Sequence, residues 1–163
     1  MKLAQGWSSS CAGAQATLVD LNPVATDKTI QRFASLNWKA RTVTSDAYTF
    51  LQQPAVDVDV IITNLFLHHF KDEPLRRLLR AIAARTSLFI ACEPRRSNLA
   101  LNACRLLPLI GCNSVTRHDA VVSVQAGFEG NELSALWPGN DNWELSEQPA
   151  GLFSHCFVAK RNA

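Results

Sequence analysis

Residues 56–67 (VDVDVIITNLFL) constrain the fold more than any other segment of this chain. Their centre, residues 60–62, is an unbroken apolar and β-branched run, which is typical of a parallel strand covered by helices on both faces. The segment after it predicts a helix that starts near Asp72, because Pro74 suits a first helical turn. Its apolar residues form one stripe: Leu75, Leu78, Leu79 and Ile82. A buried strand followed by an amphipathic helix indicates a βα unit.

Strand and helix patterns alternate along the rest of the chain. Further strands are predicted at residues 16–20, 41–46, 87–92, 143–147 and 152–161. Helices are expected after Asn22 and Pro23, around residues 48–51, from Ser97 through Leu107, and over residues 119–126. The last two strands flank Pro149-Ala150-Gly151, which predicts an antiparallel hairpin. The pattern therefore predicts an α/β, Rossmann-like open sheet that is mostly parallel, with helices on both faces and this C-terminal antiparallel hairpin.

Composition narrows the class of protein further. The chain has 163 residues, 47% of them hydrophobic, and no repeat or linker divides it, so we expect a single domain over residues 1–163. The formal net charge of +2 is too small to indicate nucleic-acid binding, and no apolar run is long enough to cross a membrane. The five cysteines are odd in number and form no CxxC pair. They indicate buried free thiols in a reducing cytoplasm.

Polar residues end the otherwise apolar strands of the predicted sheet: Asp20, Asp46, Asn64 and Glu93. Ligands of open α/β sheets bind beyond the carboxyl ends of the strands. An acid at such an end can accept hydrogen bonds from both ribose hydroxyls of a nucleotide. Single acids at strand ends are also common helix caps, and the spacing alone leaves both interpretations open.

Several segments together resemble class I S-adenosylmethionine-dependent methyltransferases. They are Leu18–Pro23 (LVDLNP), Thr44–Ala47 (TSDA), Asp59–Phe70 (DVIITNLFLHHF), and the helix end at residues 126–128 followed by the final hairpin. The resemblance covers residues from about 16 to 161. It implies S-adenosylmethionine as cofactor, with Asp20 at the ribose and Asp46 at the adenine. The cofactor-binding residues that it implies are Asp20, Leu21, Asp46, Ala47, Asn64 and Leu65.

The same resemblance places His68 and His69 beside the methyl acceptor, for which a small organic molecule is expected. A neutral imidazole can take a proton from an acceptor oxygen near pH 7. Adjacent residues rarely point the same way, so at most one of the two is expected to act as base. The alternative is a structural role, in which one ring packs or bonds to the backbone and the other lies in solvent.

The sequence departs from the family pattern at its start. The family's first strand and glycine-rich loop should precede Asp20 by a full helix, but only 19 residues do, and none of the seven glycines forms GxG. Residues 1–5 look like the end of that helix, so we expect the chain to begin inside the first βα unit. Two strands would then lack the strand between them. That gap, or the apolar helix at residues 99–110, could mediate self-association.

Three other interpretations use parts of the same pattern. A non-catalytic interaction module would keep the fold and lose the cofactor loop. A nicotinamide-dependent oxidoreductase would need a GxGxxG loop, which is absent from the sequence. A zinc site built from Cys104, Cys112, His118 and Cys156 would have spacings that fit no paired-ligand pattern, so no metal is expected.

Overall fold

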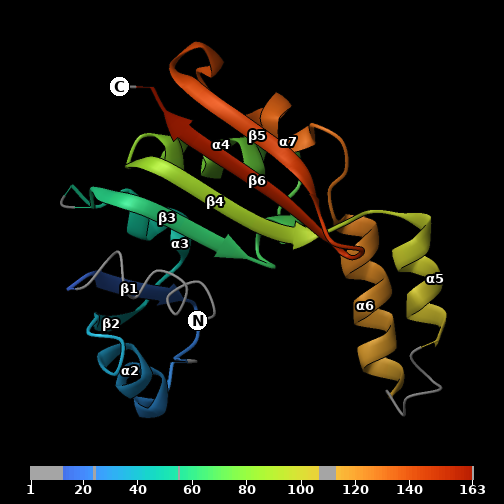
Figure 1. Cartoon of the computed structure of the whole chain (residues 1–163), viewed down its shortest axis with the longest axis horizontal. Coiled ribbons are helices and arrows are strands. Elements are labelled where there is room, and N and C mark those ends of the chain that lie inside the picture. The colour runs from blue at the N-terminus through green and yellow to red at the C-terminus, as the bar shows by residue number, and fades with distance from the viewer. Residues whose placement is uncertain (1–12, 24, 55, 107–112, 163) are drawn as a thin grey trace. The chain divides into compact units, whose positions relative to one another are not determined.

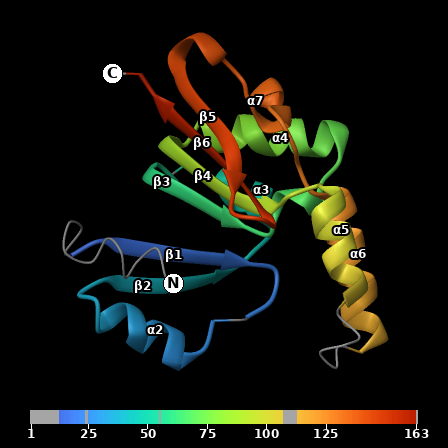
Figure 2. The ribbon, with the colours of Figure 1, turned by 45° about the vertical axis from the view of Figure 1, so that its right-hand side comes forward.

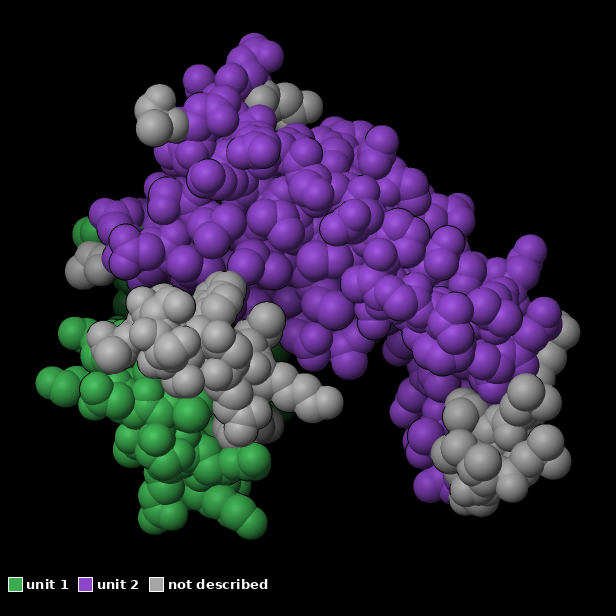
Figure 3. All heavy atoms as spheres, in the orientation of Figure 1, with its two compact units in different colours: residues 1–56 green, residues 57–163 purple. Residues whose placement is uncertain are grey.

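The computed structural model describes residues 13–23, 25–54, 56–106 and 113–162. The chain divides into two compact units, residues 1–56 (unit 1) and 57–163 (unit 2), which Figure 3 colours separately. The single-domain organisation stays a prediction, and the expected start of the chain within a βα unit concerns residues outside the described ranges.

Unit 1 contains a βαβ arrangement. Strands β1 (Gln15–Asp20) and β2 (Lys39–Thr44) are parallel and run in register from Gln15 opposite Lys39 to Asp20 opposite Thr44. Helix α2 (Asp27–Ala34) connects the two strands, and the short helix α3 (Ala47–Leu51) follows β2 (Figure 1). Both strands therefore end at the same edge of their two-stranded sheet.

Helix α2 begins later than the sequence predicted. Its N-cap is Thr26, whose side chain accepts a hydrogen bond from the Thr29 amide at 3.4 Å. The predicted cap, Asn22, instead donates its backbone N–H to Asp20 Oδ1 at 2.8 Å. This bond holds the residues after β1 in a turn, and that turn excludes them from the helix.

Unit 2 is built on a four-stranded sheet in the order β3-β4-β6-β5. The strands are β3 (Val58–Asn64), β4 (Thr86–Pro94), β5 (Trp143–Ala150) and β6 (Ser154–Arg161). Strand β3 is parallel to β4, and β6 is antiparallel to both of its neighbours. The helices are η1 (Leu67–His69), α4 (Asp72–Ala83), α5 (Asn98–Leu106), α6 (Ser114–Ala126), α7 (Glu132–Leu136) and η3 (Asn140–Asn142).

One face of this sheet forms the core. Phe89 and Phe157 on neighbouring strands are fully buried, and Trp137 stacks on Phe89 with ring centroids 5.3 Å apart. Helix α4 packs against β4 and α7 against β5. The predicted apolar stripe of α4 is confirmed, because its four members are at most 3% exposed. The predicted fold class, including the mostly parallel Rossmann-like arrangement and the C-terminal antiparallel hairpin, is confirmed as well.

Helices α5 and α6 form a hairpin that extends away from the sheet (Figures 1 and 2). Helix α6 starts at Ser114 instead of residue 119, because Asn113 caps it by accepting from the Thr116 amide at 2.8 Å. It ends at the predicted Gly127. A side chain there would overlap the carbonyl oxygen of Pro94. On α5, Leu99 is 54% exposed, so the expected covering of this helix by a partner stays a prediction.

Candidate functional site

The predicted ribose-binding residue Asp20 lies at the end of β1, and its side chain is exposed. Its Oδ1 accepts the Asn22 amide at 2.8 Å, so the carboxylate is fixed by a turn within three residues of chain. The neighbouring Leu21 is 67% exposed. A carboxylate that is accessible and held by one oxygen retains its second oxygen for a ligand hydroxyl.

Asp46 is half-buried and serves as the N-cap of α3, where its Oδ1 accepts the Thr49 amide at 2.9 Å. Ala47 is the first residue of that helix. The helix-cap interpretation of Asp46 is therefore correct. Capping uses one carboxylate oxygen and leaves the other available to a ligand. Whether Asp46 also contacts a cofactor stays a prediction.

Asn64 and Leu65 lie at the point where β3 ends and its loop begins. Asn64 is exposed and lies beside Cys92 of β4 in the parallel register. Leu65 has a φ of 52°, in the left-handed region that non-glycine residues rarely adopt, and it is 54% exposed. Its amide donates to the Cys92 carbonyl at 2.9 Å. The backbone therefore turns sharply here and presents both side chains outward.

Glu93 is the residue that organises the loop after β3. Its side chain is fully buried at the end of β4. The carboxylate accepts from the amides of Phe66 at 3.1 Å, Leu67 at 3.0 Å and His68 at 3.4 Å. It also contacts His68 Nδ1 at 2.8 Å. One buried carboxylate thus fixes a whole turn of backbone together with an imidazole.

The hydrogen bonds determine which tautomer of His68 this site favours. A carboxylate that accepts three backbone N–H groups is an acceptor, so Nδ1 carries a hydrogen and donates to Glu93, and in the neutral ring the lone pair is then on Nε2. His68 is 7% exposed. His69 is exposed, and its Nδ1 lies 3.2 Å from the Phe66 carbonyl, with a ring centroid 4.1 Å from that of His68. The two histidines therefore differ in burial and in partner.

A pocket of about 320 Å³ adjoins His68. Its lining comes from η1, from the loop after η1, from the loop after β4 and from α6. The other lining residues are Phe70, Lys71, Arg96, Val122, Gln125 and Ala126. None of these described lining residues is acidic, whereas two are cationic. The pocket has the size of a small-molecule site and combines apolar walls with a few polar groups.

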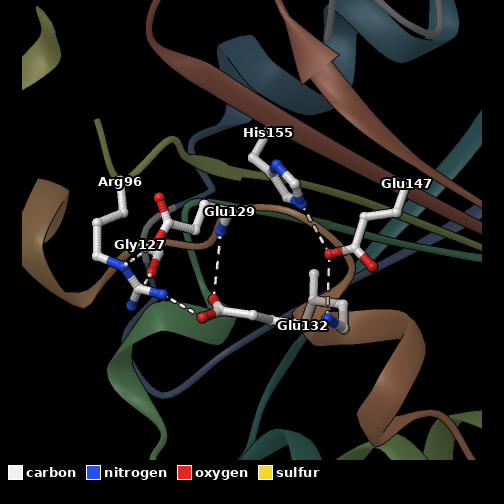
Figure 4. Close-up of polar contacts among 7 residues, drawn as sticks. Arg96, Gly127, Glu129, Glu132, Glu147 and His155 are labelled. Atoms are coloured by element: carbon white, nitrogen blue, oxygen red, sulfur yellow. Dashed lines mark hydrogen bonds and ion pairs between the residues drawn. The ribbon is translucent and has the colours of Figure 1, made fainter. Parts of the chain in front are cut away.

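Arg96, one of the residues that line this pocket, makes polar contacts with the segment between α6 and α7, which Figure 4 shows. Its guanidinium donates to Glu132 and, at 3.1 Å, to the Gly127 carbonyl, and it lies 3.5 Å from Glu129. Glu132 in turn accepts the Glu129 amide at 3.2 Å. These contacts tie the end of α6 to the start of α7. Arg96 is therefore largely satisfied within the chain, which leaves Lys71 as the more available cation.

A second buried carboxylate lies farther along the sheet. Glu147 of β5 is 1% exposed at its side chain and accepts from His155 Nε2 at 2.7 Å (Figure 4). It also accepts the amides of Leu133 at 3.0 Å and Ser134 at 2.7 Å, which lie in the first turn of α7. No sequence motif indicated a role for Glu147. The partners of Glu93 lie 25 to 27 residues earlier in the chain, whereas Glu147 lies 8 residues from His155 and 13 to 14 from the two α7 amides, and no local sequence pattern indicated either pair.

Two further points of the sequence analysis concern a metal site and a membrane-spanning helix. Among the described residues, no group of three or more histidine, cysteine, aspartate or glutamate side chains could hold a metal ion. Cys112, one of the proposed ligands, lies outside those residues. Within the same ranges, no helix has both the length and the apolar character that crossing a membrane requires.

Comparison with solved structures shows what the fold resembles. An O-methyltransferase family protein from Burkholderia thailandensis matches with a TM-score of 0.62 and 12% identity over 99% of this chain and 56% of its own. A proposed O-methyltransferase from Nostoc punctiforme matches with a TM-score of 0.60 and 12% identity over 98% of this chain and 55% of its own. LepI in complex with SAM has a TM-score of 0.52 and 11% identity over 99% of this chain and 39% of its own. The chain spans about half the length of the first two structures.

Sequence comparison identifies the family. No curated protein matches the chain. The model of a methyltransferase domain family matches residues 2–87, which is more than half of the chain and includes both predicted adenosine-binding acids and both histidines. The chain therefore belongs to the methyltransferase domain family, within the class I S-adenosylmethionine-dependent methyltransferases that the sequence resembles.

Proposed function

We propose that this protein transfers a methyl group from S-adenosylmethionine to an oxygen atom of a small molecule, with His68 as the general base. The observation that carries the proposal is the buried Glu93 carboxylate 2.8 Å from His68 Nδ1, beside a pocket that the same imidazole lines. The cofactor supplies the electrophilic methyl group when it is bound. The protein supplies position and a proton acceptor.

The residues of unit 1 suit an adenosine group. Asp20 ends β1 with an exposed carboxylate that retains one uncommitted oxygen, which is the acceptor that ribose hydroxyls need. Asp46 retains its second oxygen after capping α3, and an adenine amino group can donate to it. Asn64 and the outward-facing Leu65 are the residues of unit 2 that we assign to the methionine part of the cofactor.

Glu93 gives His68 the properties of a base. The carboxylate holds Nδ1 as the donor and fixes the ring, so that Nε2 can accept the proton of an acceptor hydroxyl. His69 is exposed and bonded to a backbone carbonyl, so we assign it the minor role.

The pocket suggests the kind of acceptor. Phe70 and the α6 residues Val122 and Ala126 offer apolar contacts, while Lys71 adds a positive charge without an acidic residue among the described lining. A small aromatic hydroxyl compound that carries a carboxylate suits this combination.

We also propose a cytoplasmic location, because the described cysteines are free thiols.

Calorimetric titration with S-adenosylhomocysteine, followed by a methyl-transfer assay, tests the proposal. Asp20→Asn should weaken binding of S-adenosylhomocysteine by about tenfold or more, through the loss of a charge-assisted hydrogen bond. His68→Asn should leave that binding unchanged and lower methyl transfer about 10²–10⁴-fold. His69→Asn is the matched control and should lower transfer far less.

A matched pair of acceptors tests the pocket. 3,4-Dihydroxybenzoate and catechol share their hydroxyls and differ in one carboxylate, and we expect the acid to be methylated faster and Lys71→Gln to remove its advantage. Absence of S-adenosylhomocysteine binding by the wild-type chain would contradict the assignment of this cofactor and favour a non-catalytic module. Equal losses from His68→Asn and His69→Asn would contradict the assignment of the base.

A further inference from the structure

Two cysteines lie directly opposite each other in the sheet of unit 2. Cys92 of β4 and Cys156 of β6 are register partners in the antiparallel pair, so their side chains emerge on the same face. That face is the one opposite Glu93 and His155, and both thiols are half-buried and free. The sequence places them 64 positions apart, and only the strand pairing brings them together.

The hydrogen bonds of the ladder show which kind of pair this is. Arg95, three residues after Cys92, donates its amide to the carbonyl of Phe153, the residue opposite it by the same register, at 2.8 Å. Hydrogen-bonded and non-hydrogen-bonded pairs alternate along an antiparallel ladder. Residues 95 and 93 therefore lie in hydrogen-bonded pairs, whereas Cys92 and Cys156 form a non-hydrogen-bonded pair.

Non-hydrogen-bonded pairs bring side chains closest. Their Cα atoms lie about 4.5 Å apart, which falls within the range of about 4.4–6.8 Å that disulfides span, at its short end. Burial raises the pKa of the Cys156 thiol, and the neighbouring Cys92 raises it further, as expected for two sulfur atoms in close proximity. The geometry thus brings the two sulfur atoms within reach of a bond.

We propose that Cys92 and Cys156 form a redox modification site, a dithiol that peroxides convert to a cross-strand disulfide and that thiol reductants restore. The Cys92 sulfur attacks the peroxide, which leaves a sulfenic acid and releases water. The Cys156 sulfur then displaces the sulfenic hydroxyl as a second water and forms the S–S bond. The two thiols lose two protons and two electrons in total, and hydrogen peroxide takes both and becomes two water molecules.

The location of the pair connects it to the loop after β3. The Cys92 carbonyl accepts the Leu65 amide, Cys92 lies beside Asn64, and Glu93 follows it directly in the chain. A bond at the short end of the Cα range strains the strands that it joins. Oxidation should therefore alter the backbone that positions Glu93 and the loop. This consequence for activity rests on the proposed function, whereas the dithiol itself does not.

Mass spectrometry on the full chain tests the site. In a variant with Cys11, Cys104 and Cys112 changed to serine, only the proposed pair remains. Hydrogen peroxide should remove both titratable thiols of that variant together, with the mass loss of two hydrogen atoms and a peptide that links residues 92 and 156. Dithiothreitol should restore both thiols. Adding Cys156→Ser should instead trap one sulfenic acid on Cys92, detected as a dimedone adduct.

Two results would overturn the proposal: oxidation of each thiol separately to sulfinic acid without a disulfide, or a linked species that appears only as a dimer of two chains. Titration of the reduced and oxidised variant with S-adenosylhomocysteine separates this proposal from the proposed function. Binding by the reduced form that falls after oxidation supports coupling to the site. A disulfide that forms in a chain binding no S-adenosylhomocysteine in either state would leave the dithiol established and remove the cofactor assignment.

Discussion

Two buried Glu–His pairs in unit 2 use the same chemistry in different surroundings. Glu93 holds His68 by Nδ1 and three backbone amides of the turn at η1, and His68 lines a pocket. Glu147 accepts hydrogen bonds from His155 Nε2 and from two amides of α7. The side chains of Glu147 and His155 are each 1% exposed. Each carboxylate satisfies backbone donors that would otherwise be buried without partners.

The difference that bears on function is access to the imidazole, because in both pairs a buried carboxylate bonds one ring nitrogen and at least two backbone amides. The free Nε2 of His68 belongs to a ring that lines a pocket, whereas His155 is enclosed by the core between β4 and β5. A carboxylate–imidazole pair is therefore not by itself a sign of catalysis in this protein. The pocket beside His68 distinguishes a candidate base from a structural histidine.

Replacement of Glu93 should have the largest effect. Glu93→Ala leaves three amides and the His68 ring without their acceptor in a buried position, so we expect a loss of about 3–5 kcal/mol in the free energy of unfolding. Urea denaturation followed by circular dichroism measures it. Glu93→Gln keeps the shape and one acceptor oxygen, and should lose clearly less. A Glu93→Ala protein as stable as the wild type would contradict the anchoring role.

Replacement of Glu147 should cost less, about 2 kcal/mol for Glu147→Ala, because this carboxylate serves two amides instead of three. The first turn of α7 should loosen. Hydrogen exchange at Leu133 and Ser134 should accelerate, while exchange at Leu67 should stay unchanged. Methyl transfer per folded molecule should also be preserved. Faster exchange at Leu67 would show that the two pairs are coupled and not independent.

Local patterns in the sequence predicted the elements but not these anchors. The strand at β3, the stripe of α4 and the C-terminal hairpin each follow from periodicity or turn residues within about a dozen positions. Glu93 was recognised as a strand-end acid, but its partners lie 25 to 27 residues earlier in the chain. Only the parallel pairing of β3 with β4 brings them together.

Short-range hydrogen bonds that the hydrophobic pattern does not reveal moved the starts of two helices away from their predicted positions. The turn made by Asp20 and Asn22 delayed α2 to Thr26, and the Asn113 cap advanced α6 to Ser114. At α2 the backbone N–H of Asn22 is bonded to the Asp20 carboxylate and Thr26 caps the helix, whereas at α6 Asn113 caps a helix that begins five residues before its predicted start. A related ambiguity applied to Asp46, where a cap and a ligand contact use the same carboxylate.

Exchange of the two histidines for asparagine should separate stability from activity. His155→Asn removes a fully buried ring from a carboxylate and should destabilise the protein by about 1–3 kcal/mol, without changing methyl transfer per folded molecule. His68→Asn should have the opposite effect, in that methyl transfer is nearly lost. Its stability should change less than that of His155→Asn, since the His68 ring adjoins a pocket that water can enter. Thermal melts and a transfer assay on the same samples test both. Equal loss of transfer in the two variants would contradict a role for access.

The smallest changes in stability are expected at the strand-end acids of unit 1, which bond only to their own segment. Asp46→Ala removes the cap of α3 and should cost about 1 kcal/mol, whereas Asp46→Asn retains a capping oxygen and should cost much less. Asp20→Ala, at an exposed carboxylate with one local bond, should change stability by less than about 0.5 kcal/mol. If Asp20 nevertheless proves essential for binding S-adenosylhomocysteine, ligand contact explains its presence better than folding does. An Asp20→Ala protein that is as stable as the wild type and binds S-adenosylhomocysteine equally well would leave this carboxylate with the turn as its one role.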